Sequence, residues 1–268
     1  MTSKTNIIVI DPIRFRGGSK VATETILHQI DNKKFSITAL TADKSSWNLP
    51  FINKYLIYEP RILRKMEQGI PYFIRHAILS LNIILTILRT KNTRILVGAS
   101  GPGVDLSIYL IGKIFNYKII QFIHGDVARS KTIGKCLTVS DNIFYLPSSY
   151  PSIINALSTI GYSDVKWKNS NHVNEFKNGI CKDQWPSSCQ YRTPVILWAS
   201  SLLKWKGLDI LMAALTEIGV KNRPTTHVCF IRPLDINLPV SNPNLSIDNV
   251  NWYEEPKNLD EIRSSSNI

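Results

Sequence analysis

The sequence of 268 residues lacks the patterns that would indicate a secreted, metal-binding or membrane-spanning protein. Its four cysteines form no CxxC pair, so we expect reduced thiols rather than a disulfide framework or a metal site. The longest apolar stretch, Ala77 to Leu88, contains Asn82 and is shorter than the roughly 20 residues that span a bilayer. No signal-peptide pattern opens the chain. These absences predict a globular protein of the cytoplasm.

Acidic residues are scarce in the first part of the chain. The net charge is +12 at pH 7, and the first 189 residues supply all of it, with 24 lysines and arginines against 12 acids. Cations flank an apolar segment, Ile74 to Leu88, and include Arg61, Arg64, Lys65, Arg75 and Arg89. A basic rim around an apolar helix suits an anionic membrane surface. A core helix with solvated cationic ends explains the pattern equally well. No nucleic-acid-binding motif accompanies the charge, so nucleic acid is not an expected partner.

Apolar runs alternate with amphipathic segments along the whole chain. Strands are predicted at 6–10, 35–40, 94–98, 118–123, 142–146, 165–167, 194–199, 226–231 and 249–252. Helices are predicted at 19–30, 70–90, 104–115, 150–160, 207–218 and 258–265. This alternation predicts parallel α/β sheets. Residues 181–193 show no periodicity, and we interpret them as a linker between a domain at 1–180 and a second at 194–268.

The segment from Pro194 to Leu215 carries the clearest functional pattern. Pro194 to Ala199 is continuously apolar, as in a parallel strand covered on both faces, and an amphipathic helix follows Lys206-Gly207. A strand that leads into a helix N-terminus provides free backbone N–H groups for an anion, and Lys206 adds a positive charge beside them. The pattern predicts a site for the diphosphate of a nucleotide.

These residues resemble the start of the C-terminal domain in retaining GT-B glycosyltransferases of the group 1 family. Lys206 and Gly207 match the Lys-Gly of that family, whereas Ser200 and Ser201 stand where Gly-Arg is usual. The resemblance makes Ser201, Lys206 and Gly207 candidate donor-binding residues.

A second match lies near the N-terminus. Gly17 and Gly18 follow the first strand and match a Gly-Gly loop that faces the cleft in this family. The alternative is an ordinary turn that uses glycine for a positive φ. Ser19 is the expected N-cap of the helix that follows.

His124 follows the predicted strand 118–123, and ligands bind at the carboxyl ends of strands in open α/β sheets. The family often places a histidine here, near the transferred sugar, so His124 is the candidate catalytic residue; the alternative is a histidine that caps a strand end. The loop from Gly98 to Gly103 is interpreted either as an anion-holding loop that lines the cleft or as a plain turn. It lacks GxGxxG, which argues against a Rossmann oxidoreductase.

The resemblance implies a GT-B-like α/β fold with two Rossmann-like domains, the second of them truncated. Its function would be transfer of a sugar from a nucleotide-sugar to a glycan or lipid-linked acceptor, by a retaining reaction that needs neither metal nor cofactor. The family's acidic motif, two glutamates separated by seven residues, is not found. A non-catalytic, glycosyltransferase-like binding module is therefore the alternative. The expected location is the cytoplasm, at the inner face of the plasma membrane.

Overall fold

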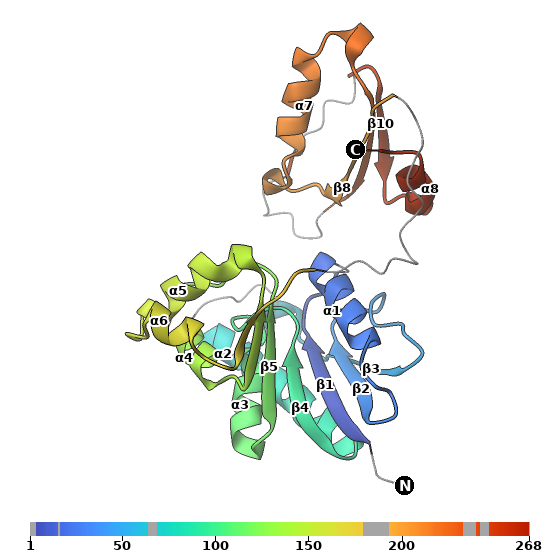
Figure 1. The fold of residues 1–268 in the computed structure, drawn as a ribbon. Helices are drawn as coiled ribbons and strands as arrows, with labels where there is room; N and C mark the ends of the chain where they lie inside the picture. The colour runs from blue at the N-terminus through green and yellow to red at the C-terminus, as the bar shows by residue number, and fades with distance from the viewer. Residues whose placement is uncertain are drawn as a thin grey trace. The chain divides into compact units, whose positions relative to one another are not determined.

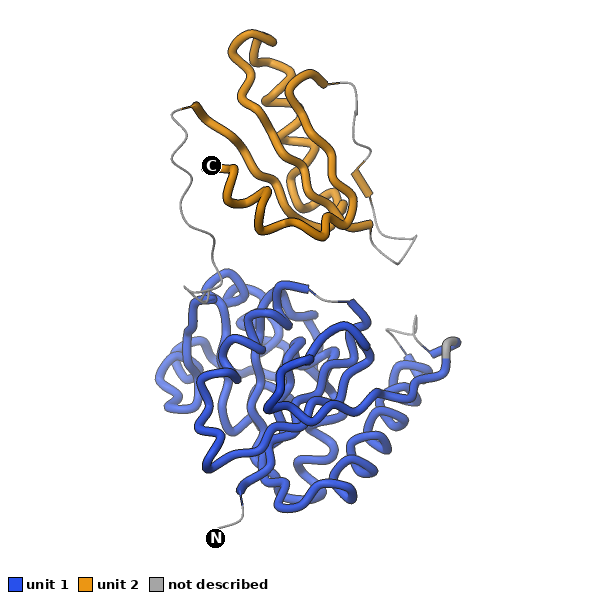
Figure 2. The backbone as a smooth tube through the Cα atoms, turned by 90° about the vertical axis from the view of Figure 1, so that its right-hand side faces the viewer, with its two compact units in different colours: residues 1–180 blue, residues 181–268 orange. Residues whose placement is uncertain are grey.

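The computed structural model describes residues 4–15, 17–63, 69–178, 193–232, 240–241 and 247–267, and for Arg61 it describes the backbone alone. The chain divides into two compact units, residues 1–180 and 181–268 (Figure 2). Each unit contains one parallel sheet with helices packed against it (Figure 1). The predicted linker 181–193 lies outside the described residues except for its last position.

The first unit has a seven-stranded parallel sheet of order β3-β2-β1-β4-β5-β6-β7. Its strands are β1 (Thr5–Asp11), β2 (Phe35–Thr41), β3 (Ile52–Leu56), β4 (Thr93–Gly98), β5 (Lys118–Ile123), β6 (Asn142–Tyr145) and β7 (Val173–Glu175). The strand order reverses between β1 and β4. In open α/β sheets, ligands bind at such a reversal, beyond the carboxyl ends of the strands.

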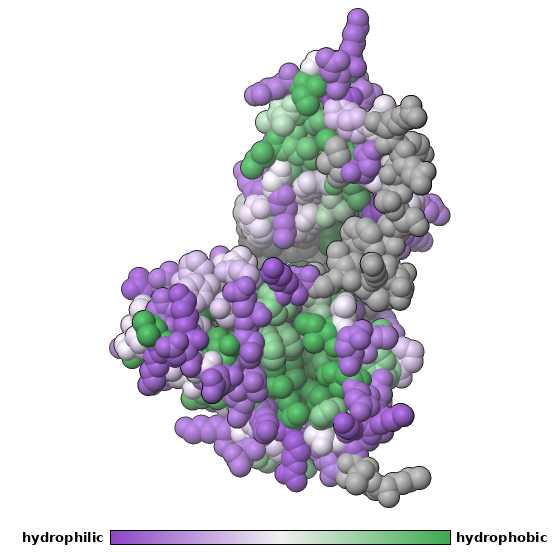
Figure 3. All heavy atoms as spheres, viewed as in Figure 1, coloured by the Kyte–Doolittle hydropathy of each residue, from purple (hydrophilic) through white to green (hydrophobic). Residues whose placement is uncertain are grey.

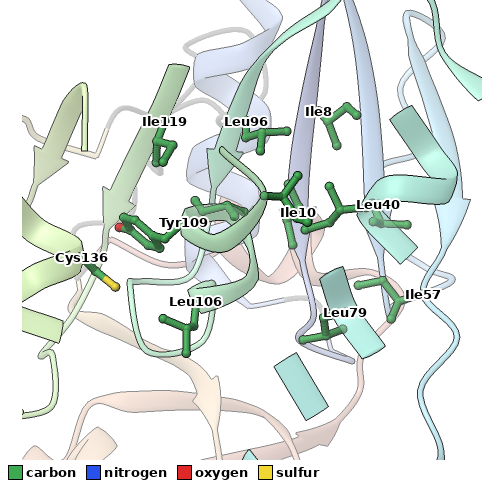
Figure 4. Packing of buried hydrophobic residues seen from close by; sticks show 13 residues of the cluster. Ile8, Ile10, Leu40, Ile57, Leu79, Leu96, Leu106, Tyr109, Ile119 and Cys136 are labelled. Carbon is green, nitrogen blue, oxygen red and sulfur yellow. The ribbon is translucent and has the colours of Figure 1, made fainter. Parts of the chain in front are cut away.

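Six α-helices accompany this sheet in the described residues. They are α1 (Gly18–His28), α2 (Gly69–Arg89), α3 (Leu106–Phe115), α4 (Lys131–Val139), α5 (Tyr150–Ser158) and α6 (Asp164–Lys168). Because side chains alternate along a strand, β1 contributes to two separate hydrophobic clusters. Ile8 and Ile10 pack with residues of α2, α3 and α4 (Figure 4), whereas Ile7 and Val9 pack with Leu27 of α1. Figure 3 shows apolar side chains gathered over the strands of this unit on the viewed face.

The second unit has a three-stranded parallel sheet of order β10-β9-β8 in the described residues. Its elements are β8 (Val195–Ser201), α7 (Leu208–Glu217), β9 (Thr225–Ile231), β10 (Val250–Glu254) and α8 (Leu259–Ser264). Leu208, Met212 and Leu215 of α7 pack on Val228 and Phe230 of β9, which forms the core of this unit.

The structure corrects several sequence predictions. Residues 165–167 are not a strand but belong to the short helix α6, because the Ser163 hydroxyl accepts a hydrogen bond from the N–H of Lys166 and caps a helical turn. The strands β3 and β7 and the helix α4 were not predicted. Ser19 is not an N-cap either, since α1 starts at Gly18 with Gly17 as the preceding cap residue.

Candidate functional site

A buried group of charges fixes the loop after β1. The Lys20 side chain in the first turn of α1 is 2% exposed, and its Nζ lies 2.9 Å from Asp11 Oδ2 and 3.3 Å from Asp43 Oδ2. The same Nζ donates to the carbonyl oxygen of Ile13 at 2.7 Å. Buried charges are tolerated when they are paired and hydrogen-bonded. The lysine thus ties the start of α1 to the ends of β1 and β2.

Further hydrogen bonds complete this buried group. Trp47 donates its indole N–H to Asp11 at 2.8 Å and its backbone N–H to Glu24 Oε1 at 2.6 Å. Burial by itself would raise the pKa of Asp43, but hydrogen bonds from Ser46 and Ser45, with the charge of Lys20, outweigh it and hold the pKa at about 2. Asp43 is therefore ionised at neutral pH.

Gly17 and Gly18 do not adopt the left-handed conformation expected of an ordinary glycine turn. Gly17 has φ of −101°, and neither residue is among the described glycines with positive φ. A Cβ added to Gly17 would lie 3.1 Å from the Phe15 ring, whereas Gly18 has open space around that position. Gly17 therefore allows close packing against Phe15, and Gly18 leaves an open surface at the N-terminus of α1. Such a surface suits the close approach of a ligand, but donor binding by these glycines stays a prediction.

His124 lies beside α1, directly after β5. Its Nε2 is 3.1 Å from Thr23 Oγ1, and its ring contacts the rings of Phe122 and Phe176. Gly17 and Gly18 stand at the start of the same helix, and His124 contacts it five residues further along, at Thr23. Burial is the main cause that lowers the pKa of His124, and an interaction with the Asn178 side chain opposes it. The imidazole is therefore neutral at pH 7.

The hydrogen bonds around Thr23 define the tautomer of His124. The Thr23 hydroxyl donates its proton to the carbonyl oxygen of Ser19 at 2.9 Å, so its oxygen acts as the acceptor toward the histidine. Nε2 therefore carries the proton, and Nδ1, which is buried, carries the lone pair. In this arrangement Nε2 is hydrogen-bonded to Thr23 and Nδ1 is buried. A direct role for His124 in catalysis would require the ring to turn away from Thr23, and that role stays a prediction.

The loop from Gly98 to Gly103 is closed by the side chain of Asp105, which follows it in the sequence. Oδ2 of Asp105 accepts hydrogen bonds from the N–H groups of Ser100 at 2.8 Å and Gly101 at 2.9 Å, and from Gln121 Nε2 at 2.9 Å. These amides are thus occupied, so the structure favours the plain turn over the anion-holding loop. Asp105 is fully buried, and burial raises its pKa to about 7.

Arg75 forms an ion pair with the buried carboxylate of Glu59. Its Nε lies 2.5 Å from Glu59 Oε1, and an Nη atom of Arg14 lies 3.1 Å from Glu59 Oε2. The Arg75 side chain is only 14% exposed, so it does not extend from the surface as a membrane or acceptor contact would. Arg89 is exposed as expected. Arg64, Lys65 and the side chain of Arg61 lie outside the described residues.

In the second unit, the predicted diphosphate-binding segment forms a braced turn. Lys206 ends a 3₁₀ helix (Lys204–Lys206) and is exposed, and its carbonyl oxygen accepts a hydrogen bond from the indole N–H of Trp198 at 3.1 Å. Gly207 has φ of +76° and precedes the first residue of α7. Ser201 ends β8 at the same edge of the sheet. Ser201, Lys206 and Gly207 therefore all lie on the short connection between the end of β8 and the N-terminus of α7.

Several residues that shape these loops were not predicted from the sequence. Trp198 was predicted only as part of an apolar strand. Its indole N–H usually has a hydrogen-bond partner when buried, and this donor could have indicated a contact with a nearby loop. Asp11 ends the first strand and Lys20 lies in the first turn of the helix that follows, so opposite charges at these two places were the signal for an ion pair. An exposed ion pair at the ends of β9 and β10, Arg232 with Glu254 at 2.6 Å, was also missed. Among the described residues, no three His, Cys, Asp or Glu side chains are grouped as metal ligands would be.

Comparison with known proteins identifies the fold. No family model and no curated protein matches the chain. The crystal structure of Arabidopsis thaliana UGT89C1 complexed with UDP-L-rhamnose matches with a TM-score of 0.54 and 14% identity, over 94% of this chain and 70% of that one. UGT89C1 complexed with UDP matches with a TM-score of 0.51 and 13% identity, over 90% and 71%. The predicted GT-B-like α/β fold is therefore confirmed.

Proposed function

We propose that this chain transfers a sugar from a nucleotide-sugar to a glycan or lipid-linked acceptor. The observation that carries the proposal is the turn at Lys206 and Gly207, where a parallel strand leads into the N-terminus of α7. Backbone N–H groups at a helix start and an exposed lysine beside them are the donors that a diphosphate requires. UGT89C1, a protein of similar fold, is complexed with UDP-L-rhamnose and with UDP, which supports a donor of this class.

The proposed roles follow from the chemistry of glycosyl transfer. When the bond between sugar and diphosphate breaks, negative charge grows on the leaving diphosphate, and fixed positive groups stabilise it. Lys206 supplies a full charge, and the amides at the start of α7 supply partial charges. The Trp198 indole fixes the carbonyl group of Lys206, which directly precedes Gly207. Ser201 is proposed to contact the donor. In the first unit, Gly17 and Gly18 are proposed as donor-binding residues and His124 as the catalytic residue. We further propose a retaining reaction without a metal, in the cytoplasm at a membrane that holds the acceptor.

Nucleotide binding tests the proposal at its central residue. For Lys206→Ala, calorimetry should show the affinity for UDP or GDP falling by roughly 1.5–3 kcal/mol, the range for a charge-assisted hydrogen bond. Lys221→Ala is the matched control, because Lys221 is another exposed lysine of the second unit, in the 3₁₀ helix that follows α7. Equal affinities for the Lys206 variant and the unchanged protein would refute the assignment.

Turnover separates the enzyme from the non-catalytic alternative. That alternative rests on the family's acidic motif, which is not found in the sequence. Purified protein incubated with UDP-, GDP- and ADP-sugars and lipid-linked acceptors should yield a glycosylated product if the proposal is right. Nucleotide binding that depends on Lys206, but without any product, would favour the binding module.

A further inference from the structure

The helix α2 (Gly69–Arg89) combines a buried face with an exposed apolar face. Its inner face includes Leu79 at 1% and Ile83 at 0% exposure, both in the core cluster with Ile8 and Ile10. Figure 4 shows Leu79 in this cluster. Its outer face carries six exposed apolar side chains, which we call the α2 stripe: Ile70, Phe73, Ile74, Leu81, Leu85 and Leu88. Their exposed fractions range from 48% to 78%. Single exposed apolar residues are normal on protein surfaces, but a continuous row indicates an interaction surface.

The six residues form one continuous row along the helix. At about 100° per residue, their positions fall within an arc of about 120° on one side of α2. From Ile70 to Leu88 the row is about 27 Å long, at 1.5 Å per residue. The helix α3 packs against α2 and exposes Leu110, Ile114 and Phe115 of its own. The first unit thus exposes apolar side chains on two neighbouring helices.

By length and composition α2 could cross a membrane, but its packing indicates a different position. A spanning helix would have to leave the sheet, and Leu79 and Ile83 would then be removed from the core of the first unit. A helix that keeps this packing can still place its outer face in the headgroup region of a bilayer, with its axis along the membrane surface.

The charges near the stripe favour a lipid surface with anionic headgroups. Neither α2 nor α3 contains an aspartate or glutamate. Five exposed cations lie in the last turns of these helices, in the connection from α2 to β4, or at the starts of β4 and β5: Arg89, Lys91, Arg94, Lys113 and Lys118. Apolar side chains flanked by cations are the composition of helices that lie in anionic membrane interfaces.

We infer that the α2 stripe is a membrane-docking surface, which lies in the interface of an anionic bilayer with α2 parallel to it. The inference does not rest on the assignment of the donor, because the stripe and the Lys206 turn are in different units. It also replaces Arg75, which is bound to Glu59, as the membrane contact of the first unit.

Vesicle co-sedimentation tests the inference on the whole chain. The double variant Leu81→Gln/Leu85→Gln should bind vesicles of phosphatidylglycerol and phosphatidylcholine at least ten-fold more weakly. The control Val165→Gln/Val220→Gln removes two comparably exposed apolar side chains, from α6 and from the 3₁₀ helix Val220–Asn222, and should bind as the unchanged protein does. A third variant, Arg89→Gln/Lys113→Gln, should lose the preference for anionic over neutral vesicles and most of the salt dependence.

Three results would overturn the inference. They are equal binding by the stripe variant and the control, equal binding to neutral and anionic vesicles, and a stripe variant that dissociates an oligomer of the unchanged protein instead of weakening lipid binding. UDP affinity is measured on the same proteins and should not change. Native hydrogen-exchange protection of β1, β4 and β5 shows that the first unit of the stripe variant is folded. Lost lipid binding with retained UDP affinity separates failure of docking from failure of the proposed function.

Discussion

Asp105 makes the stability of the first unit depend on pH in an unusual direction. Its carboxylate is fully buried, and burial raises its pKa from 3.8 to about 7. The substitution Asp105→Asn removes the charge and keeps a carbonyl oxygen that can accept from Ser100, Gly101 and Gln121. Oδ1 of Asp105 makes no hydrogen bond in the structure. The NH₂ group of the asparagine can therefore take the place of Oδ1 without displacing a hydrogen-bond donor.

The sign of the effect follows from proton binding. Between pH 4 and 7 the folded protein holds a proton on Asp105 that the unfolded chain has lost, so the free energy of unfolding falls as pH rises through this window. One pKa unit corresponds to 1.36 kcal/mol, and the raised pKa thus predicts a loss of about 2–3 kcal/mol between pH 5 and pH 8. The asparagine variant has no such proton and should lose none of this stability.

Urea unfolding at pH 5 and pH 8 measures this difference, with hydrogen exchange of the strands reporting each unit separately. The stability of Asp105→Asn relative to the unchanged protein should be about 2–3 kcal/mol more favourable at pH 8 than at pH 5. Asp126→Asn, at an exposed position of the same unit, should show no such change. A pH-independent difference for Asp105→Asn would refute the reasoning.

Two further predictions concern the packing of the first unit. Lys20→Met leaves Asp11 and Asp43 without their buried cation and should lower the free energy of unfolding by about 3–5 kcal/mol, as urea titration would show; an unchanged midpoint would contradict it. Gly134→Ala places a Cβ 2.7 Å from a backbone oxygen of a neighbouring helix and should cost about 1–3 kcal/mol in the same assay, whereas Gly125→Ala, with open space, should cost little, and equal effects would contradict the argument.

The sequence predicted most of the fold because buried parallel strands are visible as apolar runs. Residues 118–123 were predicted as a strand with the bounds that the structure shows. The strand Ile52–Leu56 was missed because it lies at the sheet edge and includes Asn53 and Lys54, which interrupt the apolar pattern. Residues 165–167 were misread because three alternating residues carry no length information, and the cap at Ser163 decided the local structure.

The site was harder to predict, because the sequence shows which residues are charged but not which charges face one another. Arg75 looked like part of a basic rim, yet it is bound to Glu59, sixteen positions earlier. The loop Gly98–Gly103 looked able to hold an anion, yet a carboxylate from its own chain occupies two of its amides. In both cases the groups were correctly identified as able to bind an anion, but a carboxylate of the same chain already occupies them.

The candidate ligand-binding loops in the two units share a physical design. In the first unit, Lys20 fixes the start of α1 by bonds to two carboxylates and a carbonyl oxygen, so Gly18 keeps an open surface without having to be flexible. In the second unit, the Trp198 indole holds the carbonyl oxygen of Lys206, which leaves the lysine side chain free to move. Backbone amides that are already in place lose little entropy when an anion binds, which lowers the cost of binding. Hydrogen bonds that hold such loops in place would therefore favour nucleotide binding. The substitution Trp198→Phe keeps an aromatic ring but loses the indole N–H, so it should weaken UDP binding without unfolding the second unit.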